Sequence, residues 1–228
     1  MKNIVVLTGA GISAESGLKT FRDANGLWEG HDVMEVATPE GFENNPALVL
    51  EFYNQRRRQL LTVEPNAAHK ALLDLEAHYN VHIITQNVDD LHERAGSSNI
   101  LHLHGELLKA RSISSAEDIF ECTHDILLGD TCKNGFQLRP HIVWFGEAVP
   151  LLEDAIAITE KADYLIIVGT SMQVYPAAGL IDFVHSGTPI YFIDPKPSIT
   201  ESHKKNLTII TQNAVDGLPT LVASLIDK

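Results

Sequence analysis

The chain has 228 residues, of which 44% are hydrophobic and 21% are charged, and this size suits one good core with a smaller appended unit. Its formal net charge of −13 disfavours nucleic acid and anionic membrane surfaces, so we expect neither as a partner. Cys122 and Cys132 are too few for a disulfide framework, and the apolar run near the N-terminus is too short for a secretory signal, so a cytoplasmic location is expected.

The first predicted element is a buried strand, Ile4–Leu7, which runs into a glycine-rich turn. Gly9, Gly11 and Ala14 match the loose form of the dinucleotide-binding fingerprint. In such a turn the glycines let the backbone approach a pyrophosphate, and the following helix offers free N–H groups at its N-terminus. A dehydrogenase would continue with a full helix and a second strand, whereas residues 17–23 form a polar and aromatic segment.

Three helices are predicted next. The first has Thr38 as its N-cap and Pro39 at its first position. The second begins at residues 44–46 and extends to about Leu61, and the third covers residues 65–79.

The second of these helices carries an arginine within an apolar stripe. At about 100° per residue, Arg56 falls on the same face as Tyr53. An arginine in that position must reach solvent or pair with an anion. Arg56 and Tyr53 therefore form either a pocket floor suited to a carboxylate or part of a structural ion pair. Arg57 and Arg58 fall outside the stripe, so we expect both to be solvated.

Polar residues directly follow the next predicted strand, Val81–Thr85. Gln86, Asn87 and Asp89 lie where open α/β sheets bind ligands, at the carboxyl end of a strand. Asn87 or Asp89 can also cap the start of a helix, and the two roles are compatible.

Two histidines share one face of the strand that begins at Ile100, because strand residues alternate with a period of two. His104 precedes Gly105 at the strand end, whereas His102 lies within the strand. The position of His104 favours a general base, and a structural histidine is the alternative.

The remainder of the chain returns to alternating strands and helices after an insertion. Residues 109–138, which contain both cysteines, are predicted to be irregular. A strand and an aromatic-glycine turn are expected within residues 139–147. The later predicted elements are a helix at 151–161, a strand at 164–168, a helix at 176–185, strands at 189–193 and 207–210, and a helix at 218–226.

This alternation predicts an α/β protein with a Rossmann-like parallel sheet, helices on both of its faces and a smaller inserted domain. The expected boundaries place residues 1–24, 64–106 and 141–228 in the Rossmann-like domain. Residues 25–63 and 107–140 would form the small domain, a helical lid plus a lobe, with a cleft between the two domains.

Six motifs in this order resemble the sirtuins, which are NAD-dependent protein-lysine deacylases. They are GAGIS at 9–13, FRD at 21–23, QNVD at 86–89, HG at 104–105, FGE at 145–147 and GTS at 169–171. Tyr53 and Arg56 further resemble the Tyr-x-x-Arg signature of the class III branch, which includes the CobB-type bacterial enzymes and removes succinyl and malonyl groups. Residues 37–42 also resemble that branch, in which Gly41 would leave room for a longer acyl group.

The resemblance implies that NAD is a consumed co-substrate that lies across the carboxyl edge of the sheet, in the Rossmann-like domain. Phe21, Arg22 and Asp23 would form a mobile loop over the nicotinamide ribose. The remaining implied contacts of NAD are Gly9, Ala10, Gly11, Ile12, Ser13, Glu15, Trp28, Gln86, Asn87, Val88, Asp89, Gly169, Thr170, Ser171, Asp194, Pro195, Lys196 and Ala214.

Acyl-lysine proteins or peptides are the implied partners, and nicotinamide and an O-acyl-ADP-ribose are the implied products. His104 would act as the general base on a ribose hydroxyl, and Asn87 would be the second catalytic residue. A substrate peptide would add as a strand between two loops. The implied substrate contacts are Gly41, Tyr53, Arg56, Val143, Phe145, Gly146, Glu147 and Val174.

The chain departs from the family pattern where most sirtuins bind a structural zinc. Ser112 and Ser115 stand about where the first cysteine pair would be, and serines do not make a structural zinc site, so no zinc is expected. Apolar residues would then hold the lobe together, such as Ile119, Phe120, Ile126, Leu127 and Leu128. The alternative is a substitute metal site made from Cys122, His124, Asp130 and Cys132.

Two further departures lie near the cofactor. Asp194 stands where the family usually has Asn and adds charge near a dianionic cofactor, and Lys19 stands where Pro is usual. We expect an NAD-dependent desuccinylase and demalonylase with weaker deacetylase activity. The alternatives are an ADP-ribosyltransferase or NAD glycohydrolase on the same fold, or a non-catalytic module that binds NAD or ADP-ribose.

Overall fold

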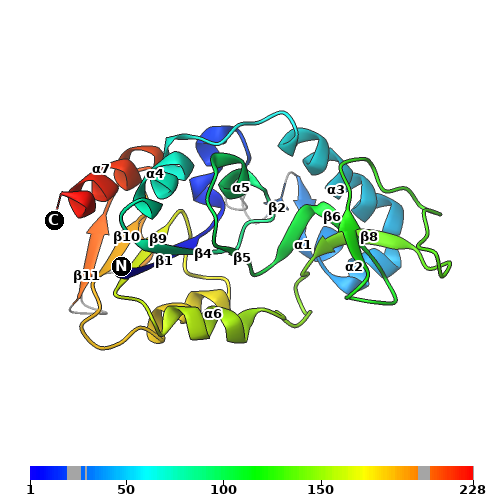
Figure 1. Ribbon diagram of the computed structural model, residues 1–228. Coiled ribbons are helices and arrows are strands. Elements are labelled where there is room, and N and C mark those ends of the chain that lie inside the picture. The colour runs from blue at the N-terminus through cyan, green and yellow to red at the C-terminus, as the bar shows by residue number, and fades with distance from the viewer. Residues whose placement is uncertain (20–26, 29, 200–205, 228) are drawn as a thin grey trace.

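The computed structural model describes residues 1–19, 27–28, 30–199 and 206–227. Phe21, Arg22 and Asp23, predicted to form the loop over the cofactor, lie outside the described residues. The larger part of the molecule is a six-stranded parallel sheet (Figure 1). Its strands, in spatial order, are β11 (Leu207–Ile210), β10 (Ile190–Ile193), β9 (Tyr164–Val168), β1 (Asn3–Thr8), β4 (Asn80–Thr85) and β5 (Ile100–His102).

The order of these strands is that of a doubly wound sheet. Numbered within the sheet in chain order, they run 3-2-1-4-5-6 from β5 to β11, the order of the dinucleotide-binding folds. The order reverses between β1 and β9, which are direct neighbours. The predicted Rossmann-like sheet is therefore confirmed.

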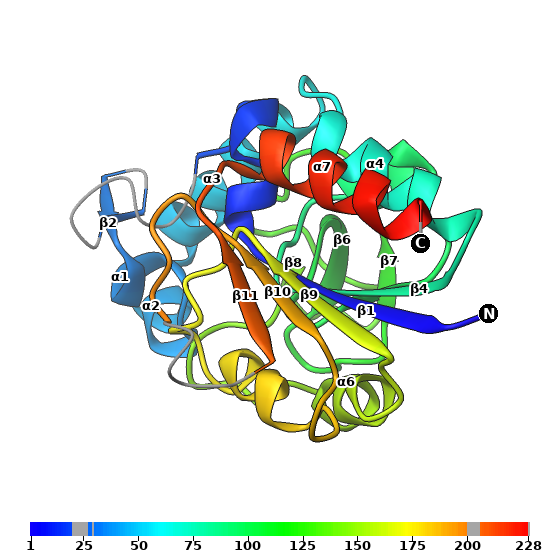
Figure 2. The same cartoon turned by 90° about the vertical axis from the view of Figure 1, so that its left-hand side faces the viewer.

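Apolar residues alternate along β1 between two cores, one on each face of the sheet. Ile4 and Val6 pack with α4 (Ala67–Glu76) and α7 (Ala214–Ile226). Val5 and Leu7 face α6 (Leu152–Thr159) and η3 (Ala177–Asp182). Figure 2 shows α4 and α7 on one face of the sheet and α6 on the other. The predicted coverage of both faces is confirmed.

Helix α7 begins at Ala214, before its predicted start at residue 218. Gly217 and Pro219 are residue types that disfavour a helix interior, so the sequence does not indicate this first turn. A Cβ on Gly217 would lie 2.7 Å from Cγ2 of Ile193, so the glycine lets the helix approach the sheet closely. The helix predicted at 176–185 is also different, since only the short 3₁₀ helix η3 forms there. None of the helices within the described ranges is both long and apolar enough to cross a membrane.

A smaller unit lies at the end of the molecule away from both termini (Figure 1). Its helices lie against a three-stranded antiparallel sheet in the order β7-β6-β8. Its elements are β2 (Leu27–Trp28), β3 (His31–Asp32), α1 (Val33–Val36), α2 (Pro39–Asn44), α3 (Pro46–Leu60), β6 (Gly105–Ser112), β7 (Ile119–Glu121) and β8 (Leu138–Ile142). Three short helices complete the chain, namely η1 (Ala10–Ile12), η2 (Ala14–Ser16) and α5 (Leu91–Ala95).

The prediction that residues 109–138 are irregular is wrong for the strands β6 and β7. A register shift between Glu106 and Ala110 breaks the alternation of β6, and Pro140 interrupts the pattern of its partner β8, so the sequence hides this pairing. The predicted starts of α2 and α3 are confirmed by their caps. Thr38 Oγ1 accepts from Gly41 N at 2.9 Å, and Asn45 caps α3 in the same way. The predicted domain boundaries stay a prediction.

Candidate functional site

A cavity of about 700 Å³ opens at the carboxyl edge of the parallel sheet. One wall consists of the loops after β1, β4, β9 and β10, and the other consists of α3 and the segment that follows β8. The cavity therefore lies at the point where the strand order reverses, which is where open α/β sheets bind ligands. Its volume is in the range of small-molecule and cofactor sites.

Two glycine loops form the floor of this cavity by packing backbone against backbone. Gly11 N donates to Gly169 O at 2.8 Å, and a Cβ on Gly11 would lie 2.7 Å from Gly169 Cα. Gly169 has φ +65, and a Cβ there would lie 2.3 Å from Ile12 N. These positions therefore exclude any side chain. Ile12 was predicted to contact the cofactor, but its side chain is fully buried in the core below and does not line the cavity.

Buried polar groups lie beside the glycine loops. Ser13 Oγ donates to Asp89 Oδ2 at 3.0 Å and accepts from Asn87 Nδ2 at 3.2 Å. Asp89 Oδ1 also accepts from Leu91 N at 3.2 Å, so this carboxylate both lines the cavity and stabilises the start of α5. Asp89 is only 7% exposed, and burial raises its pKa to about 6. The carboxylate of Asp89 is therefore a partly desolvated group in the cavity wall.

The two histidines of the predicted shared face have different surroundings. His104 Nδ1 lies 3.1 Å from Gln86 O, and because a carbonyl only accepts, Nδ1 carries the proton and Nε2 keeps its lone pair. Burial lowers the pKa of His104, so the ring is neutral at pH 7. His104 lines the cavity and has the protonation state of a general base.

His102 is held between two acceptors. Its Nε2 lies 2.7 Å from Glu93 Oε1, and its Nδ1 lies 3.2 Å from Asn87 O. Burial alone lowers the pKa of His102, but the hydrogen bond and the charge of Glu93 raise it above the ordinary value. His102 therefore has a structural role, in which its ring links Glu93 to the backbone of Asn87.

Tyr53 and Arg56 lie on helix α3, which forms part of the other wall of the cavity. The guanidinium of Arg56 lies over the ring of Phe52, with 3.7 Å from Cζ to the ring centroid, and 4.7 Å from the centroid of Trp28. Tyr53 is fully buried, and its hydroxyl accepts from Trp144 Nε1 at 3.0 Å. A cationic fork and a phenol therefore lie one helical turn apart in an aromatic setting.

Trp144 is a lining residue that the sequence reasoning missed. Its indole N–H can only donate and needs an acceptor when buried, but nothing in the sequence identifies Tyr53 as that acceptor. Arg139 stacks on the indole at 3.3 Å from its centroid and donates to Glu147 at 2.7 and 3.0 Å. Glu147 also accepts from Trp144 N at 2.8 Å, so its carboxylate closes the Trp144–Glu147 turn.

Gly41 does not line the cavity, and its predicted role there is wrong. It is buried where α2 meets α1, and a Cβ at this position would lie 2.3 Å from Glu35 O. The absence of a side chain at Gly41 therefore serves helix packing and leaves no room for an acyl group.

The expectation that Arg57 is solvated is also wrong. Its side chain is fully buried because α3 borders the cavity on one side and packs against the lobe on another. Arg57 Nε donates to Leu107 O at 3.1 Å, and Nη1 donates to Asn54 Oδ1 at 2.8 Å. Arg58 is exposed as expected and pairs with Glu51 and Asp125.

The lobe of residues 113–137 has little apolar support. Of the five apolar residues expected to hold it, only Ile126 is buried, in a small cluster with Leu50, Ala110 and Cys122. The exposed ones are Ile119, Phe120, Leu127 and Leu128. Within the described part of the chain, no three His, Cys, Asp or Glu side chains are grouped to hold a metal ion. The substitute set of Cys122, His124, Asp130 and Cys132 is therefore not brought together.

The structure brings most other predicted site residues to the same cavity, although their individual roles stay predictions. Asp194 is nearly buried there, and its Oδ1 accepts from Lys196 N at 2.8 Å. Further lining residues that were predicted are Gly9, Ala10, Glu15, Trp28, Gln86, Val88, Val143, Phe145, Gly146, Thr170, Ser171, Val174, Pro195 and Ala214. Lining residues that were not predicted include Leu107 and Asn213.

Comparisons with known proteins agree with this geometry. Residues 9–176 match the model of the Sir2 family. The chain is 60% identical over 228 residues to an NAD-dependent protein deacylase of Helicobacter pylori, covering 100% of this chain and 99% of that protein. It is 52% identical over 232 residues to an NAD-dependent protein deacylase of Bacteroides thetaiotaomicron, covering 99% of each.

Two solved structures are similar over nearly the whole chain. A Sir2 homologue in complex with NAD has a TM-score of 0.90 at 39% identity, covering 99% of this chain and 90% of that one. A Sir2 complex with a p53 peptide and NAD has a TM-score of 0.79 at 28% identity, covering 99% and 94%. The chain therefore belongs to the Sir2 family and is an NAD-dependent protein deacylase.

Proposed function

We propose that this enzyme preferentially removes succinyl and malonyl groups from the lysine side chains of proteins, with weaker action on acetyl-lysine. The observation that carries the proposal is the pair formed by Arg56 and Tyr53 on the α3 wall. Succinyl and malonyl groups end in a carboxylate, whereas an acetyl group does not. The α3 wall offers a guanidinium and a phenol to such an anion.

The residues of the opposite wall fit NAD. Gly9, Gly11 and Gly169 let two loops pack backbone against backbone, because a Cβ at any of them would meet the other loop. A floor without side chains allows close approach of a pyrophosphate. Asn87 and Asp89 supply polar groups held by Ser13. When bound, NAD supplies the ADP-ribosyl group that accepts the acyl group, so the proposed products are nicotinamide and an O-acyl-ADP-ribose.

His104 is the proposed general base. Its Nε2 accepts the proton of a ribose hydroxyl while Nδ1 keeps its own proton on the Gln86 carbonyl. Because this bond fixes the ring and its tautomer, the lone pair on Nε2 is held in place before the substrate arrives. Asn87 and Asp89 orient the ribose and the carboxamide in this proposal.

The selectivity follows from charge and from the direction of the Tyr53 hydroxyl. Trp144 Nε1 donates to the Tyr53 oxygen, so the phenol offers its own proton to a ligand. A hydrogen bond to a charged group contributes about 1.5–3 kcal/mol, which corresponds to roughly a 10- to 100-fold preference for an acyl group that ends in a carboxylate.

Replacement of Arg56 tests the proposal. The substitution Arg56→Met should lower kcat/KM on a succinyl-lysine peptide by about 10- to 100-fold and change kcat/KM on the acetyl-lysine peptide much less. Arg58→Met, on the exposed side of the same helix, is the matched control and should leave both values unchanged. Equal loss on both peptides in Arg56→Met would reject the carboxylate pocket. Mass spectrometry that finds free ADP-ribose in place of O-acyl-ADP-ribose would favour an NAD glycohydrolase.

We also propose that the enzyme works in the cytoplasm. Cys122 is buried, Cys132 is partly buried, and both thiols are free. Free thiols are the state that a reducing cytosol maintains. Measurement of the two thiols in protein isolated under acid trapping tests this assignment.

A further inference from the structure

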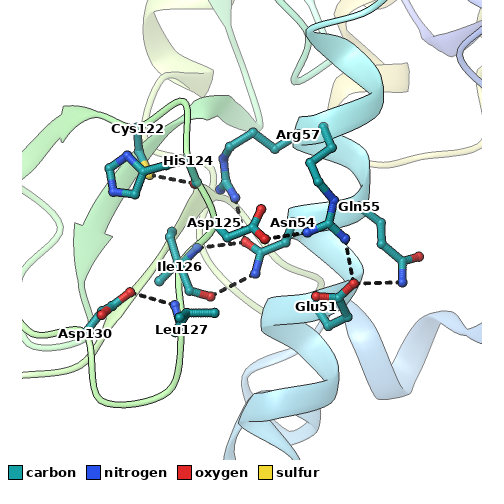
Figure 3. A network of polar contacts seen from close by, with 11 residues as sticks. Glu51, Asn54, Gln55, Arg57, Cys122, His124, Asp125, Ile126, Leu127 and Asp130 are labelled. Carbon is teal, nitrogen blue, oxygen red and sulfur yellow. Dashed lines mark hydrogen bonds and ion pairs between the residues drawn. The ribbon is translucent and has the colours of Figure 1, made fainter.

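Helix α3 carries two interleaved pairs of residues spaced three apart. Tyr53 and Arg56 line the cavity. Asn54 and Arg57, each one position later, are buried and point toward the lobe (Figure 3). Residues three apart lie on one helix face, and a shift of one position turns that face by about 100°. One helix therefore serves the cavity and the lobe at the same turn.

Asn54 is hydrogen-bonded to the lobe through both ends of its amide. Its Nδ2 donates to Ile126 O at 2.9 Å, and its Oδ1 accepts from Ile126 N at 2.9 Å (Figure 3). The same Oδ1 accepts from Arg57 Nη1 at 2.8 Å. We call the contacts among Asn54, Arg57 and the Ile126 backbone the clasp. Asn54 is only 1% exposed, so loss of its side chain would leave several buried polar groups without partners.

Arg57 extends the clasp to the cavity wall. It donates to Leu107 O, and Leu107 belongs to β6 and lines the cavity. Its Nη2 has no hydrogen-bond partner among the described residues, and no described carboxylate forms an ion pair with it. Burial of a guanidinium that has only neutral oxygens as partners costs folding free energy. Loss of either hydrogen bond of Arg57 should therefore destabilise this region strongly.

An outer layer of contacts links the same two segments at the surface. Arg58 pairs with Glu51 at 2.7 Å and with Asp125. Gln55 donates to Glu51 (Figure 3). These side chains are exposed, and exposed ion pairs contribute only about 0–1 kcal/mol. The buried clasp therefore carries most of the polar stabilisation between α3 and the loop of residues 122–130.

Apolar residues of α3 such as Phe52 and Tyr53 pack against β6 and β8. Toward the loop of residues 122–130, the apolar packing of α3 is small. Only Leu50, Ala110, Cys122 and Ile126 are buried in the cluster of the lobe. The side chains that would serve a metal site form no ligand group within the described residues. The contacts of Asn54 and Arg57 therefore add a buried polar link where the apolar packing between α3 and the lobe is small.

We propose that Asn54 and Arg57 are positioning residues for acyl selectivity, because the clasp acts with the apolar packing of α3 on β6 and β8 to fix the placement of Tyr53 and Arg56. The inference rests on the proposed function, since it assigns these two residues to the same carboxylate pocket. Loosening the clasp lets α3 shift relative to β6 and displaces the phenol and the guanidinium together. His104 and Asp89 belong to the other wall, and their contacts do not involve α3.

The variant Asn54→Leu, similar in volume, tests this role by removing both amide contacts. KM for a succinyl-lysine peptide should rise about tenfold, as expected when a charged hydrogen bond is misaligned, while kcat on an acetyl-lysine peptide changes less than about twofold. Amide exchange of residues 122–130 should accelerate at the same time. Asn54→Asp keeps the acceptor for Ile126 N and Arg57 but places a second acceptor against Ile126 O, so it should recover the succinyl KM only in part. Arg58→Met removes only the exposed link and should resemble the unaltered enzyme.

Several outcomes would overturn the proposal. One is an equal loss on succinyl and acetyl peptides in folded Asn54→Leu, and another is faster exchange of the loop with an unchanged succinyl KM. If Asn54→Leu does not fold, Arg57→Met measured with the same two peptides decides in the same way. If the unaltered enzyme shows no preference for succinyl-lysine, the proposed function fails first. The exchange experiment then still reports whether the clasp holds the lobe.

Discussion

The two walls of the cavity are built in different ways. The sheet wall rests on two large apolar clusters that cover both faces of six paired strands. The α3 wall rests on one apolar cluster, in which α3 packs against Leu107 and Ile142, and on the smaller cluster at the lobe. The buried polar contacts of Asn54 and Arg57 add to this packing. The sheet wall holds the groups proposed to meet NAD, and the α3 wall holds those proposed to meet the acyl group. Changes in the first wall should affect all acyl substrates alike, whereas changes in the second should separate them.

The largest expected effect comes from the base on the sheet wall. His104→Ala should lower kcat by about 10²–10⁴-fold, the usual contribution of general base catalysis. The loss should be the same for succinyl-, malonyl- and acetyl-lysine peptides, measured as initial rates of nicotinamide release. A loss that differs strongly between peptides would break the separation of the two walls.

The glycine floor gives the next effect, on stability. Gly169→Ala should lower the free energy of unfolding by about 3 kcal/mol or more, because a left-handed φ combines with a Cβ placed 2.3 Å from Ile12 N. Gly187→Ala is the matched control. Gly187 has φ +93 but no atom within 4 Å of a Cβ, so only the conformational cost of about 1–2 kcal/mol remains. Urea unfolding of both variants gives the two values, and similar values would argue against the backbone contact.

A pH-dependent effect should follow from Asp89. Its pKa of about 6 lies above the unfolded value, so the folded state binds more protons between about pH 4 and 6 and loses stability as pH rises through that range. Asp89→Asn removes this loss. The variant should gain up to about 2–3 kcal/mol at pH 7 and almost nothing below pH 4. Urea unfolding at both pH values measures the gain, and a gain of equal size at both would contradict the buried carboxylate as its cause.

The smallest effect sharpens the comparison on the α3 wall. Trp144→Phe keeps the ring but removes the N–H that donates to Tyr53. A neutral hydrogen bond contributes about 1 kcal/mol, so KM for the succinyl peptide should rise roughly fivefold while the acetyl peptide responds little. Steady-state kinetics on the two peptides provides the measurement. A change in KM that is confined to the acetyl peptide would contradict the assignment of Trp144 to the proposed pocket.

The sheet wall was predictable because its signals are local. Continuous apolar runs marked buried strands such as β1 and β9, and polar residues after strand ends meet at one edge in any parallel sheet. The group of Asn87, Asp89 and His104 could therefore be found without coordinates. These signals are strong because the apolar clusters are large. A small error in a predicted element boundary therefore does not change the predicted fold.

The α3 wall was less predictable because its contacts join distant segments. Arg57 looks solvated when only its own helix is considered, and nothing near Asn54 in the sequence points to Ile126. A Cβ on Gly41 would meet the backbone of Glu35 on the neighbouring helix α1, and the sequence pattern does not show this contact. Trp144 was missed for the same reason, since its acceptor Tyr53 lies on another element. Buried polar pairs of this kind depend on packing and not on periodicity.

The contact between Gly11 and Gly169 also constrains the order in which the enzyme matures. Gly11 leaves the ribosome long before Gly169, which supplies the acceptor of its hydrogen bond. Contacts this distant in sequence form late, because the intervening chain must first be ordered. A nascent chain that ends before β9 therefore carries the fingerprint residues without a nucleotide site. The dinucleotide can stabilise the protein only after both glycine loops have been synthesised.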